Sequence, residues 1–250
     1  MLEAARTSGK KLTIGYQNRY RQDSIYMKRA CVRGDLGEIY YAKAHAVRRR
    51  AVPTWGVFLD GEKQGGGPLI DIGTHALDLT LWVMDNYAPR MVVGSVYNKL
   101  AGNGDCGNIF GPWRPEAFKV EDSAFGYITM QNGATIYLET SWALNTLDTE
   151  EARTTLCGTK AGADMRDGLR INGDEFGKLY VKIPDLAAER GVDYYTERIA
   201  QPAVLEARAW IDAVKNDTPV ETKPEEALVV TQILEAVYES ARRGEPVFLA

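Results

Sequence analysis

The sequence predicts an α+β fold, a run of mainly antiparallel strands with helices before, between and after them. The clearest sign lies at residues 125–130 and 135–142, which alternate in polarity on either side of Asn132-Gly133. This pattern is typical of a β-hairpin with a type I′ turn. Residues 39–47 are β-prone and apolar on both parities, as in a central strand. Two long helical stretches close the chain.

The composition is that of an ordinary soluble globular protein, with 250 residues, 45% of them hydrophobic and 26% charged. A net charge of -4 argues against a nucleic-acid partner, which would require a clustered basic surface. The only basic cluster, Arg48-Arg49-Arg50, is interpreted as a solvated strand end. The first residues lack the apolar core of a signal peptide, and no run of about 18 apolar residues could cross a bilayer. We therefore expect a cytoplasmic protein without a membrane partner.

The cysteines do not suggest a framework of disulfides or a metal site. Cys31, Cys106 and Cys157 form no short CxxC spacing, and only two histidines could join them. Structural zinc usually requires four such ligands at close spacing, so no metal is predicted.

The chain opens with a helix, residues 2–8, that Gly9 ends, and a short buried strand follows at residues 12–16. A helix and a strand with no strand before them are typical of the end of a βαβ unit. The remaining elements are expected as follows: a helix from Asp23 or Ser24 to Arg33 that Gly34 ends, a strand at 91–97, a long loop at 101–119, strands at 154–157, 169–172 and 179–183, the last two joined by the turn 173–177, helices at about 203–216 and 224–243, and a strand at 247–249.

The stretch GGGPLIDIGTHALDLTLW, residues 65–82, carries the strongest candidates for chemistry. Its glycines cannot hold a helix, whereas Pro68 suits a first helical turn because no hydrogen bond is lost there. On a helical wheel of about 100° per residue, an arc of about 60° contains Asp71, His75, Asp78 and Trp82. Apolar residues fill the opposite side, so this polar stripe is expected to face a cleft, a partner group or water.

Asp71 and His75 have a structural interpretation beside the catalytic one. An aspartate in a first turn stabilises a helix through its charge, and a buried histidine is often a satisfied polar group. The catalytic interpretation is favoured by the glycine triplet, which allows close backbone approach, and by Gly73, which leaves room for a ligand.

A glycine motif at residues 102–107 is set aside. Gly102, Gly104 and Gly107 match G-x-G-x-x-G, but a dinucleotide site requires a helix directly after the glycines. Gly111 and the prolines near it forbid such a helix, so no cofactor-binding residues are assigned.

Two further groups have open interpretations. GYQNRY, residues 15–20, follows the predicted strand and is either a ligand-binding turn or a polar loop. Trp55, Trp142 and Tyr137 could line a sugar-binding cleft, although aromatic residues in strands usually belong to the core.

Several stretches together resemble the Gfo/Idh/MocA family of NAD(P)-dependent oxidoreductases: SGKKLTIGYQNRY, GDLGEIYYAKA, GGGPLIDIGTHALDL, LCGTKAG and TKPEEALVVTQILEAVYESARRGEPV. The D-x-x-x-H within the third is the most specific. The resemblance implies a Rossmann domain followed by an open, mainly antiparallel sheet with helices packed on one face. Residues 1–20 would be a remnant of the dinucleotide-binding domain, and residues 21–250 the substrate-binding and oligomerisation domain.

The resemblance also implies roles for individual residues. His75 corresponds to the family's catalytic histidine and Asp71 to its substrate-binding acid. Asn18 lies where relatives place a substrate contact, and Trp55 and Trp142 are looser candidates for the same role. The implied reaction is hydride transfer from a sugar or polyol CH-OH group to NAD or NADP, with His75 taking the hydroxyl proton.

The glycine fingerprint and the family's E-K-P motif are both absent from this sequence, and Lys223-Pro224 only begins the last helix. We therefore expect a substrate-binding portion that is inactive alone and binds its cofactor weakly. It is also expected to form a dimer or tetramer through the open sheet face. The alternative is a non-catalytic carbohydrate-binding or oligomerisation module.

Overall fold

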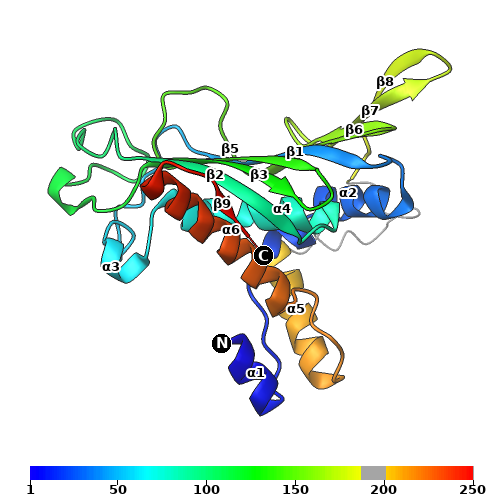
Figure 1. The fold of residues 1–250 in the computed structure, drawn as a ribbon, viewed down its shortest axis with the longest axis horizontal. Coiled ribbons are helices and arrows are strands. Elements are labelled where there is room, and N and C mark those ends of the chain that lie inside the picture. Colours follow the sequence, from blue (N-terminus) through cyan, green and yellow to red (C-terminus); the bar gives the residue numbers. More distant parts are fainter. Residues whose placement is uncertain (187–200, 250) are drawn as a thin grey trace, which may run out of the picture.

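A computed structural model describes residues 1–186 and 201–249. Their centre is one open sheet in the order β8-β7-β6-β5-β1-β4-β3-β2-β9 (Figure 1). Every neighbouring pair is antiparallel except β1 and β4, which are parallel. The strands are β1 Ile39–Val47, β2 Pro89–Tyr97, β3 Ser123–Met130, β4 Thr135–Ser141, β5 Glu150–Gly158, β6 Ala161–Asp164, β7 Arg170–Glu175, β8 Lys178–Lys182 and β9 Val247–Phe248. The predicted mainly antiparallel sheet is confirmed.

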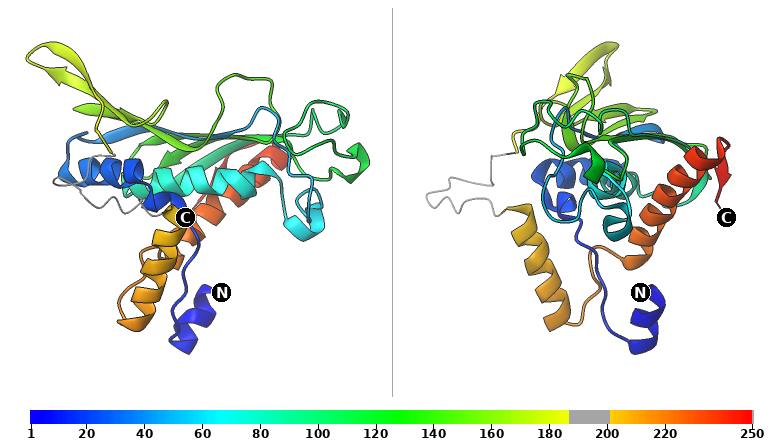
Figure 2. Two further views of the ribbon diagram at one scale, coloured as in Figure 1. Left: turned by 180° about the vertical axis from the view of Figure 1, so that it is seen from behind. Right: turned by 90° about the vertical axis from the view of Figure 1, so that its left-hand side faces the viewer.

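The helices lie on one side of this sheet, as predicted. In Figure 2, α1 and α5 extend away from the sheet on that side, while the opposite face carries no helix. The helical elements are α1 Leu2–Ser8, η1 Gln17–Tyr20, α2 Gln22–Arg33, α3 Gly61–Gln64, η2 Leu69–Gly73, α4 Thr74–Met84, η3 Pro115–Ala117, α5 Pro202–Lys215 and α6 Pro224–Arg243. No helix among the described residues is both long and apolar enough to span a membrane.

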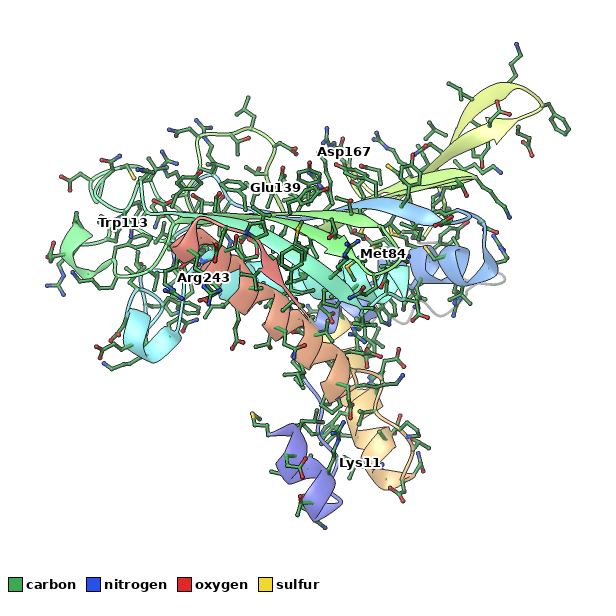
Figure 3. All side chains as sticks on the ribbon, viewed as in Figure 1. Lys11, Met84, Trp113, Glu139, Asp167 and Arg243 are labelled. Carbon is green, nitrogen blue, oxygen red and sulfur yellow. The ribbon has the colours of Figure 1, made fainter. Side chains whose placement is uncertain are left out.

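Strand β1 shows why α4 can pack so closely under the sheet. Ala42, Ala44 and Ala46 are completely buried, and they share the parity that faces α4. Their small side chains allow the axis of α4 to lie close to the sheet. The space between β1 and α4 is therefore filled mainly by strand backbone and by the side chains of the helix. His45, of the other parity, pairs with Glu139 on the face without helices, where Figure 3 labels Glu139.

The predicted strand at residues 12–16 is wrong. α1 ends at Gly9, whose φ of 64° confirms the glycine cap, but residues 10–16 form no strand. A strand requires a neighbouring backbone to pair with, and this segment instead has side-chain contacts to the α5–α6 connection. The Lys11 ammonium donates to Thr218 O at 2.8 Å, and the Thr13 hydroxyl donates to Thr222 O at 3.0 Å.

The predicted hairpin of β3 and β4 is confirmed, but its type I′ turn is wrong. Between β3 and β4 only Gly133 has a positive φ, 88°, whereas a type I′ turn requires one at Asn132 as well. Gly133 N–H donates to Met130 O, so the connection is a three-residue loop ended by a left-handed glycine. Two consecutive positive φ values occur instead at Phe176, 54°, and Gly177, 71°, in a two-residue turn shorter than the predicted 173–177.

Several other elements begin or end a few residues from their predicted bounds, and strand β6 is absent from the prediction. β6 is only four residues long and contains Ala and Gly, so it carries little β-propensity of its own. α2 begins before Asp23, which does not cap it but accepts the Ser24 N–H and pairs with Arg21. Gly34 still ends this helix, and α6 runs from Pro224 to Arg243 with Gly244 as its cap, as predicted.

Candidate active site

The glycine-rich stretch turns into a helix at Pro68, as predicted, but its first turn is unusually wide. Leu69–Gly73 is a π-helical turn, and α4 follows directly at Thr74. A π turn contains an additional residue, so residues before and after it do not lie on one uniform helical wheel. Such turns frequently occur at functional sites, and this one contains Asp71 and precedes His75.

A carboxylate that sequence reasoning missed holds the start of this helix. Glu121 accepts the Gly67 N–H at 2.9 Å and the Leu69 N–H at 3.1 Å, and it accepts the Tyr238 hydroxyl at 2.8 Å. It thereby satisfies two N–H groups that have no partner within the helix. A Cβ at Gly67 would lie 2.3 Å from Glu121 O, so this position requires glycine. The only sequence signal was a pair of carboxylates, Glu121 and Asp122, at the start of a buried strand.

Asp71 is fixed in place by the core. The indole Nε1 of Trp142 donates to Asp71 Oδ2 at 2.9 Å, and the Trp142 side chain is completely buried. Burial raises the pKa of Asp71, while the Trp142 hydrogen bond and the positive charges of Arg48 and His75 counteract that rise. Trp142 therefore supports Asp71 from behind, and its own side chain has no exposed surface that could contact a substrate.

His75 lies one turn further along, half-buried and unpaired among the described residues. Its Nδ1 is buried without a hydrogen-bond partner, and its ring stands edge-on to the Tyr16 ring at 5.9 Å. Burial lowers the pKa of His75, and the negative charges of Asp71 and Glu151 act in the opposite direction. The Tyr16 hydroxyl is 3.0 Å from Thr74 Oγ1, which attaches the GYQNRY segment to the start of α4.

The predicted polar stripe divides into two parts, because Asp78 has a structural partner. Arg19, from GYQNRY, donates to both Asp78 carboxylate oxygens at 3.0 and 2.6 Å, and to Glu226 at 2.7 Å. The side chains of Arg19 and Asp78 have no exposed surface. Burial alone would lower the pKa of Arg19, but these carboxylates raise it above its ordinary value. Asp78 and Arg19 therefore stabilise the fold, and half-buried Asn18 beside them is the remaining ligand candidate of the turn.

The predicted aromatic cleft does not form as a single unit. Trp55 is 52% exposed and lines a cavity of about 940 Å³, together with Trp113, Arg114 and Lys119. That cavity includes neither Asp71 nor His75. Two rings connect it to Trp142: Phe58, which lies edge-on to both Trp55 and Trp142, and Phe118, which contacts both Trp113 and Trp142. Tyr137, in the central strand β4, has the opposite parity to Trp142 and lies on the face without helices, beside Tyr41 and Tyr127.

The interpretation of Arg48-Arg49-Arg50 as a solvated strand end holds for Arg49, which is exposed, but is wrong for Arg48. Arg48 is only 18% exposed, and its guanidinium makes a two-point ion pair with Glu151 while donating to Ala51 O at 3.1 Å. Since the charges of Arg48 and Glu151 both act on Asp71, the ion pair belongs to the same region of the molecule. Nothing in the sequence linked these two residues, which are 103 positions apart.

The described residues contain no metal cluster, and their glycine motif is not a phosphate-binding turn. No group of three or more potential metal ligands occurs among them. Gly102, Gly104 and Gly107 lie in a loop, and the next helical element is the short η3, so the glycines do not open a helix as a dinucleotide site requires. This motif therefore does not fit the pyrophosphate of NAD(P).

The comparison with known families decides the identity of the domain. Residues 28–249 match the model of an oxidoreductase family described as its C-terminal alpha/beta domain, the Gfo/Idh/MocA family. The chain belongs to the Gfo/Idh/MocA oxidoreductase family. The resemblance found in its sequence motifs is thereby confirmed, and the open sheet is the α/β domain of that family.

Individual relatives agree with this assignment. D-glucoside 3-dehydrogenase from Escherichia coli (strain K12) is 35% identical over 249 residues, which cover 100% of this chain and 68% of the enzyme. The crystal structure of aldose-aldose oxidoreductase from Caulobacter crescentus, complexed with glycerol, matches with a TM-score of 0.74 at 18% identity, over 99% of this chain and 67% of that one. Levoglucosan dehydrogenase in complex with NADH matches with a TM-score of 0.71 at 16% identity, over 94% and 65%. At such low identity the two structures show a common fold.

Proposed function

We propose that this chain is the substrate-binding portion of an NAD(P)-dependent oxidoreductase that acts on a CH-OH group of a sugar or polyol. The observation that carries the proposal is the arrangement of Asp71, fixed by Trp142, one turn before the unpaired His75. The similarity to D-glucoside 3-dehydrogenase, whose name specifies a glucoside, supports a sugar as the substrate.

His75 is the proposed proton acceptor. Because burial lowers the pKa of its ring, the imidazole is neutral near pH 7 and can accept a proton from a substrate hydroxyl. Asp71 is the proposed binding group for neighbouring hydroxyls, since its carboxylate is already held by one indole N–H and retains other lone pairs. We assign Asn18 as a further substrate contact and Trp142 as the residue that orients Asp71, whereas Trp55 lines a separate cavity.

Oxidation of a CH-OH group also removes a hydride, for which NAD or NADP is the proposed acceptor. Because the glycine motif at residues 102–107 does not fit its pyrophosphate, we derive no step through the cofactor. Weak binding of NAD(P) by this chain remains a prediction, which titration with NADH and NADPH checks. The division into a dinucleotide-binding remnant, residues 1–20, and a substrate-binding domain, residues 21–250, belongs to the same proposal.

Assembly through the open face of the sheet is proposed as well. This face exposes large apolar side chains on β2 and β4, which flank β3, among them Val93, Tyr97 and Tyr137, which are 38–42% exposed. Exposed apolar surface of this kind is typical of interaction sites. The same observation favours the second candidate function, a non-catalytic carbohydrate-binding or assembly module in which His75 has no chemical role.

Replacing His75 tests the proposal. In an active enzyme that contains this chain, His75→Gln is expected to reduce turnover of a glucoside by about 10²- to 10⁴-fold, the usual contribution of a general base. His45→Gln is the matched control, because the chain has only two histidines and His45 pairs with Glu139 on the other face of the sheet. Unchanged turnover in His75→Gln would leave only the binding or assembly role.

A further inference from the structure

We propose that Glu151, held by Arg48, accepts a hydrogen bond from a second hydroxyl of the sugar bound at Asp71 and His75. The proposal rests on the proposed function, because it names a further specificity-determining residue of the same site. It follows from the course of two strands, β1 and β5, at the point where they leave the sheet.

Arg48 points toward the helices. Along β1 the residues with completely buried side chains under α4 are Ala42, Ala44 and Ala46, and Arg48 continues their parity. The Arg48 N–H donates to Ser141 O at 2.9 Å, which preserves the strand geometry one residue beyond the end of β1. The side chain of Arg48 therefore emerges on the face of the sheet that holds Asp71 and His75.

A β-bulge brings Glu151 to the same face. His45 pairs with Arg153, but Val47 pairs with Glu150, so two residues of β5 oppose Ala46 alone. In a regular strand Glu151 would share the face of Arg153, two positions away. The additional residue turns the side chain of Glu151 to the opposite face. This explains why Glu150 pairs with Arg153 on the open face while Glu151 pairs with Arg48.

The bulge is maintained against local backbone preference. Ala152 has a positive φ of 50°, a conformation that a residue with a Cβ rarely adopts. The Ala152 carbonyl accepts a hydrogen bond from the Arg21 guanidinium at 3.0 Å. Because Arg21 follows Asn18 closely in the chain, that segment holds the bulge in place. Strained conformations of this kind cluster at functional sites, and this one occurs in the bulge that sets the direction of Glu151.

The charge of Glu151 reaches both candidate catalytic residues. It raises the pKa of Asp71 and the pKa of His75, so it lies within electrostatic range of each. Its side chain is 46% exposed, whereas that of Arg48 is 18% exposed. A carboxylate has about four acceptor positions, and the two-point contact with Arg48 leaves others open toward solvent for a hydroxyl.

The test is a titration of the whole chain with methyl α-D-glucoside, followed by NMR. Glu151→Gln is expected to bind the glucoside about tenfold more weakly, the loss expected for one hydrogen bond to a charged group. Glu150→Gln is the matched control, because it changes the neighbouring carboxylate on the opposite face, and it should bind as the unmodified chain does. Equal affinity in Glu151→Gln would overturn the inference and leave the proposed function intact, whereas no glucoside binding by the unmodified chain would overturn both.

The His75 ring supplies a second readout that a purely structural role would not change. Removing the charge at residue 151 should move the NMR titration of the His75 ring to lower pH. Glu151→Asp keeps the charge but shortens the side chain by one methylene, so it should retain the His75 titration and still lose glucoside affinity. A His75 titration that is unchanged in Glu151→Gln would show that residue 151 does not face the site.

Discussion

The Trp142 indole N–H and the Asp71 carboxylate are joined by a 2.9 Å hydrogen bond that connects the end of β4 to the π turn before α4. One partner is completely buried and the other is half-buried at the candidate site. The position of the carboxylate is therefore determined by the core, and a change behind the site should affect the site itself.

Trp142→Phe is expected to lower the free energy of unfolding by about 2 kcal/mol or more, since it removes a hydrogen bond to a charged group and leaves space in the core. It should also raise the pKa of Asp71, because the Trp142 hydrogen bond, which this substitution removes, lowers the pKa in the unmodified protein. Urea unfolding measures the first effect and NMR of the carboxyl carbon the second. Trp113→Phe is the control, since its indole donates to Ala101 O and should leave the Asp71 titration unchanged.

His75 should titrate below the ordinary histidine pKa of about 6.5, because burial disfavours the charged ring. The unfolded chain then binds more protons at this residue than the folded chain, so folding stability decreases as the pH falls below about 6.5. His75→Gln should remove this part of the slope, which urea unfolding between about pH 5 and 7.5 measures. Asp71→Asn should shift the His75 titration to still lower pH; a shift upward would contradict the assigned interaction.

Arg19→Met is expected to destabilise the protein by about 3–5 kcal/mol, because it leaves Asp78 buried without its ion-pair partner. Thermal unfolding followed by circular dichroism measures the loss. The exposed pair between Arg6 and Glu225 provides the comparison, since Arg6→Ala should cost less than about 1 kcal/mol. Similar losses of stability in both variants would indicate that burial does not increase the contribution of the Arg19 ion pair to stability.

Gly67→Ala should destabilise the protein by about 1–3 kcal/mol, since the new Cβ would lie 2.3 Å from Glu121 O and force the start of the helix to move. Gly107→Ala, in the glycine motif that was set aside, meets no atom within 4 Å and should change stability by less than about 0.5 kcal/mol. Chemical denaturation of the two variants under identical conditions measures the difference. A large loss in Gly107→Ala would show that this loop is held more tightly than its surroundings indicate.

Local signals predicted the helix ends and the strands well. Gly9, Gly34 and Gly244 adopt the left-handed conformation expected of helix-ending glycines, and Pro68 and Pro224 begin helices. These features depend on the conformational preference of one residue, which the sequence states directly. The failures lie where a distant partner decides: residues 12–16 have no neighbouring strand, and the hairpin loops depend on how each pair of strands meets.

The sequence by itself determined the family, the fold class and the two residues on which the proposed chemistry depends, because these follow from short motifs and from periodicity. Only the tertiary structure decided what each polar residue does. Asp78 is bound by Arg19, whereas Asp71 is held by Trp142. The physical reason is that a buried charge is stabilised by whichever partner the fold brings within hydrogen-bond distance, and Asp78 and Arg19 are 59 positions apart in the chain.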